Sequence, residues 1–368
     1  MEVYCKMTLL EILTKREHSW KSGKEYADVL EKVKNGEYDP NKVDDYGNNA
    51  LHLAAWFGCE IELFKAILSK IKNVNAMNKD SLTALMIACD RHSPCRNDYN
   101  WYCKEKKRGK DSIKLPLKNS LQNTLDMVKS LIEHKDIDAD IQSENDKYGQ
   151  QTALMFAFKF YGYQSHNQYA NEVKREMAKQ ILIELLKKSN CELFGGDDSR
   201  LYENVLGRTV LGFNALHFAV FYGCHTDVFD EILGKIKDVN QPTKDRKETA
   251  LHLISMKEDD DRPDNVKYML KKLLEHPKIK INEDDNGRTA LYYAIRAQNL
   301  ATITLLMENG IDYTKTYNKM SAMKMAFTIA QRTRDRLSIK ILHYLFDYIE
   351  KQGCCANGSL QACRKLKF

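Results

Sequence analysis

The sequence predicts an all-α fold, a solenoid of stacked helix-turn-helix units with β-turn fingers between them. Three observations predict it. A triplet of Asn, Thr or Ser, then Ala, then Leu or Met recurs seven times along the 368 residues. An apolar segment at helical spacing follows each triplet, and turns of Asp, Asn and Gly lead into it. The triplets begin at Asn49, Thr83, Thr152, Asn214, Thr249, Thr289 and Ser321, at intervals of 34, 69, 62, 35, 40 and 32 residues. A near-constant period with two roughly doubled intervals indicates one repeated unit.

Each triplet predicts the start of a short first helix. The polar side chain at its first position can accept a hydrogen bond from a free amide of the first helical turn. Ala then continues the helix without cost, and Leu begins its buried face. A His follows three of the triplets, at His52, His217 and His252, and Gly58 and Gly223 are placed to end their helices.

A second apolar helix is predicted after each first helix. In the unit that begins at Asn49, the apolar residues Ile61, Phe64 and Leu68 fall at helical spacing. The unit closes with an extended Asn-Val-Asn piece at 73–75. A turn rich in Asp, Asn and Gly, all turn-forming residues, then leads into the next unit.

The pattern resembles the ankyrin repeat family. Residues 44–58 read D-D-Y-G-N-N-A-L-H-L-A-A-W-F-G against the family unit D-x-x-G-x-T-P-L-H-x-A-A-x-x-G, and residues 284–294 read D-D-N-G-R-T-A-L-Y-Y-A. The Pro of the family triplet is Ala in all seven copies, which keeps good helix propensity. The copy at Ser321 is the most degenerate, as expected of a terminal repeat whose outer face meets water.

The resemblance implies a cap, a repeat domain and a tail. Two helices expected at 7–16 and 24–34, with a closing turn that resembles the family's A-D-P-N, make residues 1–41 a divergent N-terminal cap. Residues 42–350 then form the ankyrin repeat domain of about seven repeats, and residues 351–368 form a C-terminal tail.

The two long intervals carry three insertions, at residues 93–120, 162–172 and 190–211. In the first, a helix ends near Arg91 and the next resumes around Leu121. Insertions in repeat arrays map to loops, which often lie on the binding face. Decoration without a role in binding is the equally weighted alternative.

Composition favours a protein that works inside the cell. The chain is 29% charged, and no apolar run approaches the ~20 residues that span a membrane. Its start lacks the pattern of a signal peptide, and its 10 Cys show no paired spacing, so reduced thiols and a cytoplasmic location are expected. A net charge of +6 is too mild and mixed to favour nucleic acid. The basic run at 104–110 leaves a nuclear location open.

Sequence signatures of chemistry are absent. No P-loop, dinucleotide-binding glycine pattern, HExxH or GxSxG motif occurs, so we expect no enzyme, no cofactor and no small-molecule substrate. His92, Cys95 and Cys103 invite a zinc interpretation, but the spacing lacks a second close pair and a fourth ligand, so no metal is expected. In the ankyrin family the repeated His is structural, and the same role is expected here.

The family resemblance places a protein partner on a concave strip formed by the turn tips and the exposed side of the first helices. Trp, Tyr and Arg are the residues most enriched in binding hot spots. For Trp56, Phe57, Phe221 and Tyr222, contact with a partner and packing against neighbouring repeats are both open. Matched onto this chain, the expected partner-binding residues are Asp45, Tyr46, Trp56, Phe57, Arg91, Tyr148, Lys159, Phe160, Phe221, Tyr222, Arg246, Lys257 and Arg296.

The expected function is therefore that of a non-enzymatic scaffold or adaptor that binds a protein partner. Two narrower alternatives follow from the family. One is an inhibitor of an NF-κB-like transcription factor, although the D-S-G-x-x-S degron of such inhibitors has no match here. The other is a ubiquitin-ligase substrate adaptor, because residues 359–364 faintly resemble the start of a SOCS box.

Overall fold

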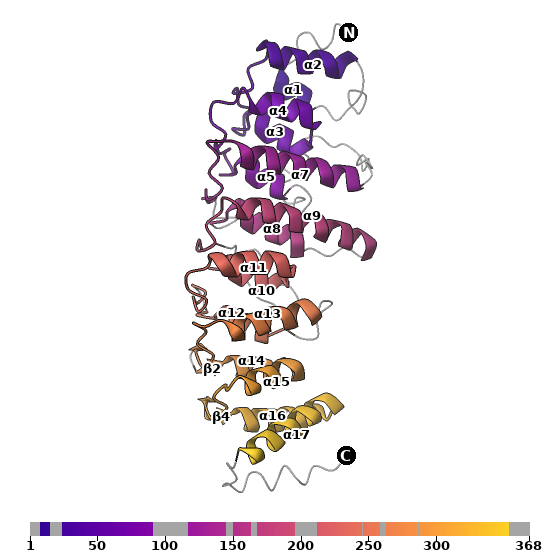
Figure 1. The fold of residues 1–368 in the computed structure, drawn as a ribbon. Helices are drawn as coiled ribbons and strands as arrows, with labels where there is room; N and C mark the ends of the chain where they lie inside the picture. Colours follow the sequence, from indigo (N-terminus) through magenta and orange to yellow (C-terminus); the bar gives the residue numbers. More distant parts are fainter. Residues whose placement is uncertain are drawn as a thin grey trace. The chain divides into compact units, whose positions relative to one another are not determined.

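The chain folds into paired helices that form two compact units, Met1–Lys235 and Ile236–Phe368, in the computed structural model (Figure 1). The structure describes residues 8–14, 24–90, 117–144, 150–162, 168–195, 212–244, 246–257, 263–285 and 287–352. These residues hold 16 helices and four two-residue strands, which confirms the predicted all-α solenoid class with β-turn fingers.

The first unit has two layers of helices. The first helices of successive pairs pack in one row, and the second helices pack in a parallel row. The first row is α1 (Leu9–Thr14), α3 (Ala50–Phe57), α5 (Ala84–Asp90), α8 (Ala153–Gly162) and α10 (Ala215–Tyr222). The second row is α2 (Lys24–Asn35), α4 (Ile61–Leu68), α7 (Leu117–Glu133), α9 (Gln168–Leu186) and α11 (Thr226–Lys235). The core of the unit lies between the rows, where residues such as Leu51, Leu63, Phe64 and Ile67 are fully buried.

The second unit repeats this arrangement. Its first helices are α12 (Ala250–Ser255), α14 (Ala290–Arg296) and α16 (Ala322–Thr333), and its second helices are α13 (Pro263–Glu275), α15 (Leu300–Glu308) and α17 (Arg336–Lys351). Two fingers are antiparallel ribbons that join β1 (Asp284–Asp285) to β2 (Arg288–Thr289) and β3 (Thr316–Tyr317) to β4 (Met320–Ser321). Each ribbon ends at the N-cap of the first helix that follows it.

The triplets cap the first helices as their sequence predicts. The side chains of Asn49, Asn214, Thr249, Thr289 and Ser321 each accept a hydrogen bond from an amide of the first helical turn. Gly58 and Gly223 end their helices in the left-handed conformation, which glycine adopts without steric cost. Local capping chemistry therefore sets both ends of α3 and α10.

His52 and His252 each link their first helix to the turn that follows. Nδ1 of His52 accepts from the Asn49 amide (3.2 Å), and Nε2 lies 3.0 Å from the carbonyl oxygen of Ala76. Because a carbonyl only accepts, Nε2 carries the proton. Burial lowers the pKa of His52 from 6.5 to about 4, so the ring is neutral at pH 7. His252 makes the same pair of contacts with Thr249 and Glu283, which agrees with the expected structural role.

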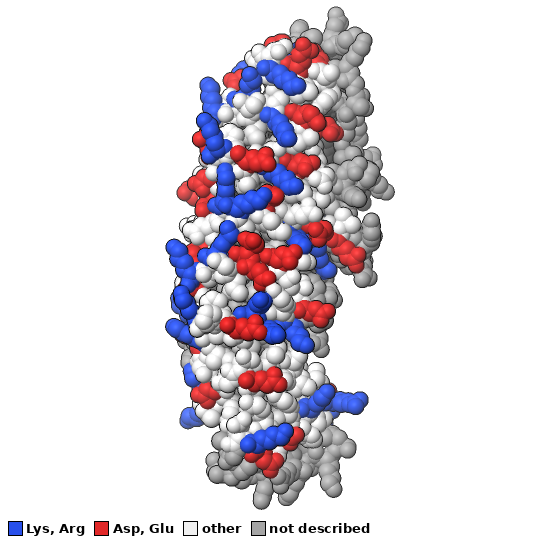
Figure 2. Space-filling view, in the orientation of Figure 1, with Lys and Arg blue, Asp and Glu red and all other residues white. Residues whose placement is uncertain are grey.

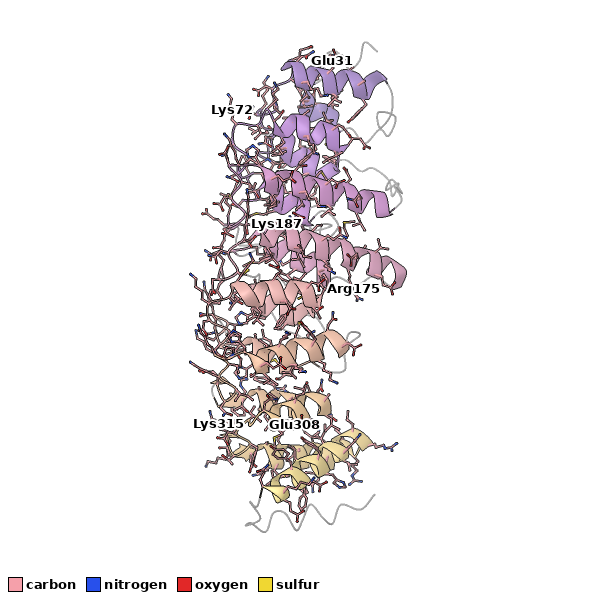
Figure 3. The ribbon with its side chains drawn as sticks, viewed as in Figure 1. Glu31, Lys72, Arg175, Lys187, Glu308 and Lys315 are labelled. Atoms are coloured by element: carbon pink, nitrogen blue, oxygen red, sulfur yellow. The ribbon has the colours of Figure 1, made fainter. Side chains whose placement is uncertain are left out.

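Asparagine side chains join successive closing turns. Nδ2 of Asn41 donates to the Lys70 carbonyl (3.2 Å), and its Oδ1 accepts from the Lys72 amide (2.8 Å). Asn75 and Asn240 make equivalent pairs of bonds to the turns that follow them. Figure 3 shows Lys72 on the edge of the first unit where the turns gather. These bonds fix the spacing between neighbouring turns.

Two helices begin inside segments that the sequence assigns to insertions. Helix α7 includes residues 117–120, and α9 includes residues 168–172. Residues 190–195 belong to a closing turn, since Gly195 and Phe213 exchange both backbone hydrogen bonds at 2.8 and 2.9 Å. Polar first turns carry no apolar periodicity, which is why the spacing of apolar residues places these helix starts too late. The predicted tail lies outside the described residues except for its first two positions.

Candidate protein-binding face

The finger face is the surface formed by the turns before the first helices and by the exposed side of those helices. In the first unit it includes the fingers at 44–49 and 78–83 together with α3. Asp45 at the tip of the first finger is exposed, and Tyr46 beside it is half-buried. Trp56 and Phe57, at the end of α3, are also half-buried. Four of the expected partner-binding residues thus lie on or beside one face.

Hydrogen bonds hold the two fingers together. The Asp44 carboxylate accepts from the amides of Tyr46 (2.9 Å) and Asn48 (2.8 Å). Nδ2 of Asn78 then donates to Oδ1 of Asn48 (2.8 Å), which links one finger to the next. The Lys79 amide adds a bond to the Tyr46 carbonyl (2.9 Å). A partner would therefore meet a preorganised surface, and little ordering entropy would be lost on binding.

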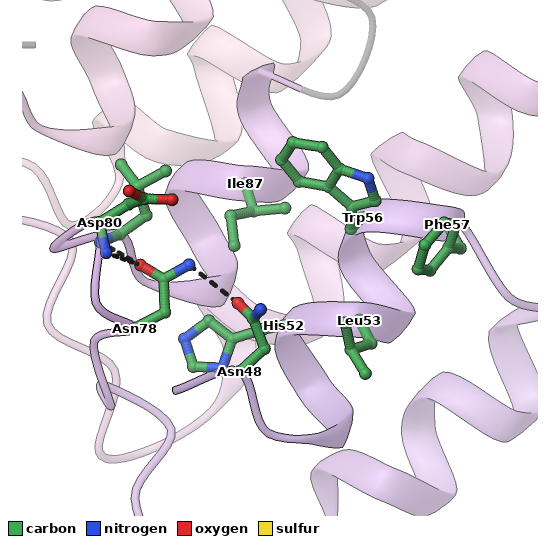
Figure 4. A pocket seen from close by; sticks show the side chains of 9 residues that line it. Asn48, His52, Leu53, Trp56, Phe57, Asn78, Asp80 and Ile87 are labelled. Atoms are coloured by element: carbon green, nitrogen blue, oxygen red, sulfur yellow. Dashed lines mark hydrogen bonds between the residues drawn. The ribbon is translucent and has the colours of Figure 1, made fainter. Parts of the chain in front are cut away.

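Trp56 borders a small cavity between α3, α5 and the second finger. Figure 4 shows Ile87 between Trp56 and the turn that holds Asn78, whose bond to Asn48 is drawn as a dashed line. The cavity holds about 10 Å³, roughly one water-sized sphere. Small-molecule sites are far larger, at ~300–1,000 Å³. The half-buried Trp56 ring offers contact area to a macromolecule rather than a chamber for a ligand.

Lys159 and Phe160 differ from their expected exposure. Only 3% of Lys159 and 2% of Phe160 is exposed. They occupy the positions of Trp56 and Phe57, but α8 has 10 residues against the eight of α3, and it packs between α5, α9 and α10. The Lys159 ammonium lies 5.5 Å from the centre of the Phe156 ring, a favourable cation–π arrangement. These two side chains are packing residues.

Phe221 and Tyr222 belong to an aromatic cluster at the end of α10. The rings of Phe221 and Tyr222 meet edge to face at 5.1 Å, and Phe221 meets Phe213 at 5.6 Å in the same manner. Tyr222 stacks on Phe218 at 6.1 Å and is only 6% exposed, whereas Phe221 is half-buried. Packing therefore explains Tyr222, while Phe221 retains an exposed part.

The remaining expected residues lie in the second unit or outside the described residues. Arg246 in a finger and Arg296 at the end of α14 are exposed, and Lys257 after α12 is half-buried. Arg91 and Tyr148 lie outside the described residues, as do His92, Cys95 and Cys103 of the zinc interpretation. Within the described ranges, no group of His, Cys, Asp or Glu is arranged to hold a metal ion. None of the described helices has the length and apolar character to cross a membrane.

A cluster of one arginine and three tyrosines on the second unit was not expected from the sequence. The Arg288 guanidinium lies 5.6 Å from the ring centres of both Tyr293 and Tyr317. Tyr292 meets Tyr293 at 5.3 Å and Tyr317 at 5.1 Å, both edge to face. Tyr292 stands where His52 and His252 stand in their repeats. The Tyr292 ring contacts the Tyr317 ring of the next finger, whereas His52 and His252 bond to a backbone carbonyl. The replacement of His by Tyr at this position is the feature of the sequence that could have pointed to the cluster.

Comparison with protein families decides what this arrangement is. A family model described as Ankyrin repeat matches residues 46–79, and one described as Ankyrin repeats (3 copies) matches residues 216–317. The chain contains ankyrin repeats. Ankyrin repeats are in general protein–protein interaction modules. The total of about seven ankyrin repeats stays a prediction, since the matched residues hold one copy and three copies.

No curated protein has a sequence that matches this ankyrin repeat chain. Surface charge gives little further direction. Figure 2 shows Lys and Arg interspersed with Asp and Glu over the face turned to the viewer. A surface of mixed sign provides no extended field for a uniformly charged partner.

Proposed function

We propose that this ankyrin repeat protein is a non-enzymatic scaffold or adaptor that binds a protein partner through its finger face. The observation that supports the proposal most is the pairing of rigid fingers with half-buried Trp56, Phe57 and Tyr46 on one side of the first unit. Aromatic side chains with one face exposed give large contact area at low cost in conformational entropy.

The proposal includes the expected place of action. The free thiols of Cys89 and Cys191 suit a reducing compartment. We therefore propose the cytoplasm, with the nucleus as the alternative. Burial raises the pKa of the Cys191 thiol to about 11, so this thiol is a packing group and not a nucleophile at pH 7.

Site-specific photo-crosslinking tests the proposal. A photoreactive residue is placed at Asp45 or Arg296 on the finger face, or at Lys65 on α4 or Lys271 on α13 as matched controls. All four positions are exposed, so insertion should leave the fold intact. The proposal predicts crosslinks to one protein from the finger-face positions. Equal labelling from α4 and α13, or none from the fingers, would contradict it.

The same capture experiment separates the narrower roles. Recovery of cullin and elongin with the chain would favour the ubiquitin-ligase adaptor, and recovery of Rel-type factors would favour the transcription-factor inhibitor. No contact among the described residues favours either role over the other. Both therefore stay predictions beneath the broader proposal.

A further inference from the structure

We propose that the finger face of the second unit binds an acidic segment of the partner, with Arg296 and Arg288 as its charged anchors and Tyr292 and Tyr317 as its apolar floor. This inference rests on the proposed function and names the chemistry of the partner. It concerns the second unit alone, from the finger at 284–289 to the exposed side of α14 and α16.

The aromatic cluster supplies the floor of this site. Tyr292 and Tyr317 are half-buried and meet edge to face at 5.1 Å, so each ring retains an accessible part. Tyr293 lies beneath them and is buried, with its hydroxyl donating to Oε1 of Glu248 (3.3 Å). The bond to Glu248 anchors the cluster from below. Its two outer rings are thus held in place before any partner arrives.

Arg288 is oriented by the same rings. An arginine stacked on aromatic rings keeps its N–H groups in the plane of the guanidinium, where carboxylates bind by two parallel hydrogen bonds. The Arg288 guanidinium lies 5.6 Å from the ring centres of both Tyr293 and Tyr317, and these two rings restrict its movement. The side chain therefore loses less rotamer entropy on binding an acid than a freely moving arginine would.

Arg296 extends the site along α14. It follows Tyr292 by four residues on the same helix, and residues so spaced lie on one face. Lys324 holds the position in α16 that Tyr292 holds in α14, three residues after the N-cap, and the two helices pack against each other. Arg296 and Lys324 are both exposed. The cations and the rings thus form one continuous strip from the finger to the first helices.

The charge on this strip favours an acidic occupant. Among the residues of the strip whose side chains the structure describes, the acid is Glu248, which is buried. By contrast, α13 and α15 balance Lys267, Lys271 and Lys272 against Asp264, Glu275 and Glu308. An excess of one sign steers a partner of the opposite sign and fixes its register. The cations on the described fingers and first helices of this unit are Lys244, Arg246, Lys247, Arg288, Arg296, Lys319, Lys324 and Arg332.

Fluorescence anisotropy with defined probes tests the inference on the full chain. The probe is a labelled peptide of alternating Glu and Leu, and its neutral counterpart has Gln in place of Glu. We expect the acidic peptide to bind and the Gln peptide to bind at least about tenfold more weakly, because each ionic hydrogen bond is lost. Equal binding of the two peptides would overturn the inference.

Charge-matched variants locate the site. Arg296→Glu and Lys271→Glu change the net charge equally, but Lys271 lies on α13, away from the finger face. We expect Arg296→Glu to weaken binding about tenfold and Lys271→Glu to change it little. Tyr317→Phe keeps the ring and should bind normally, whereas Tyr317→Ala should weaken binding while the helical signal persists. Equal losses from the two charge variants would show general attraction and overturn the inference.

Further experiments distinguish the acidic peptide from other anionic ligands, and a failure of this inference from a failure of the proposed function. Tighter binding of a single-stranded oligonucleotide or of phosphatidylserine vesicles than of the acidic peptide would overturn the peptide assignment. Another outcome is a captured protein partner that binds the Arg296→Glu variant with normal affinity and fails to bind the Trp56→Ala variant. That result would refute this inference and leave the proposed function standing. Absence of any finger-face crosslink would refute the proposed function as well.

Discussion

The ring of Tyr222 lies directly against the end of the preceding first helix at Gly162. A Cβ atom on residue 162 would overlap Cδ1 of Tyr222. The absence of a side chain on residue 162 therefore admits the tyrosine. This contact joins α8 to α10 and explains why Tyr222 packs while Trp56, at the end of α3, stays half-exposed.

Replacing Gly162 with Ala should destabilise the first unit by roughly 1–3 kcal/mol, the usual cost of overpacking. The Tyr222 ring would have to move, and its stack on Phe218 would move with it. Thermal and urea unfolding measure the loss. Gly234→Ala in α11 is the matched control, because nothing lies within 4 Å of its added Cβ. The control should stabilise by about 0.5–1 kcal/mol through helix propensity. Equal changes in the unfolding free energy of the two variants would contradict the close packing of Tyr222 against Gly162.

Tyr222→Ala should cost ~3 kcal/mol or more of unfolding free energy, as truncation of a buried aromatic ring does. Its side chain is 6% exposed and packs among Phe218 and Phe221. Chemical unfolding followed by circular dichroism measures the change. A near-wild-type midpoint would return Tyr222 to the list of surface contact residues.

Trp56→Ala should act on affinity more than on folding. Since the ring is half-buried at the edge of a cavity, we expect binding of the captured partner to weaken by ~2 kcal/mol or more, the threshold for a hot spot. Calorimetric titration gives the affinity, and a melt of the same sample shows how much folding contributes. A variant that melts early yet binds normally while folded would refute the contact role.

Asp140→Asn should stabilise the first unit by about 1 kcal/mol at pH 7. Asp140 accepts from the Asn190 amide (2.7 Å), and an Asn here could also donate to the carbonyl of Lys188, as Asn41 donates to Lys70. Burial raises the pKa of the Asp140 carboxyl, and the nearby Asp138 raises it further. The folded state therefore holds this proton more tightly than the unfolded state. The wild type should gain stability as the pH falls through the folded pKa, so the advantage of Asn should shrink in acid.

Urea unfolding at pH 7 and at pH 4 measures this advantage. Asp136→Asn is the control, since it removes the same charge from an exposed side chain in the same turn. Equal stabilisation by both variants would indicate a general charge effect and not completion of the asparagine pattern.

His52→Phe should lower stability at pH 7 by roughly 1–3 kcal/mol, because it leaves the Asn49 amide and the Ala76 carbonyl without their ring partners. It should also flatten the pH dependence. The native pKa is about 4 against 6.5 in the unfolded chain, so the native state binds fewer protons between these values. Stability should therefore fall as the pH drops through that window in the wild type, and less so in the variant. An unchanged slope would argue against a buried neutral His52.

Local chemistry made much of the fold predictable. Asn49 and Gly58 cap α3 through bonds within a few residues, so their pattern reads directly from the sequence. The burial of Lys159 could not be read in this way, because it depends on the length of α8 and on the packing of that helix against α5, α9 and α10. Arg288 and Tyr317 likewise meet only when two fingers stack. A sequence pattern within one repeat therefore does not predict side-chain environments that depend on contacts between repeats.

Hydrogen–deuterium exchange of the full chain, with and without the crosslinked partner protein, tests the central claim most directly. The account predicts slower exchange at the fingers and first helices, in residues 44–57 and 284–296, with little change in α4 and α13. Protection confined to α4, α13 or α15, with unchanged exchange at the fingers, would contradict binding through the finger face.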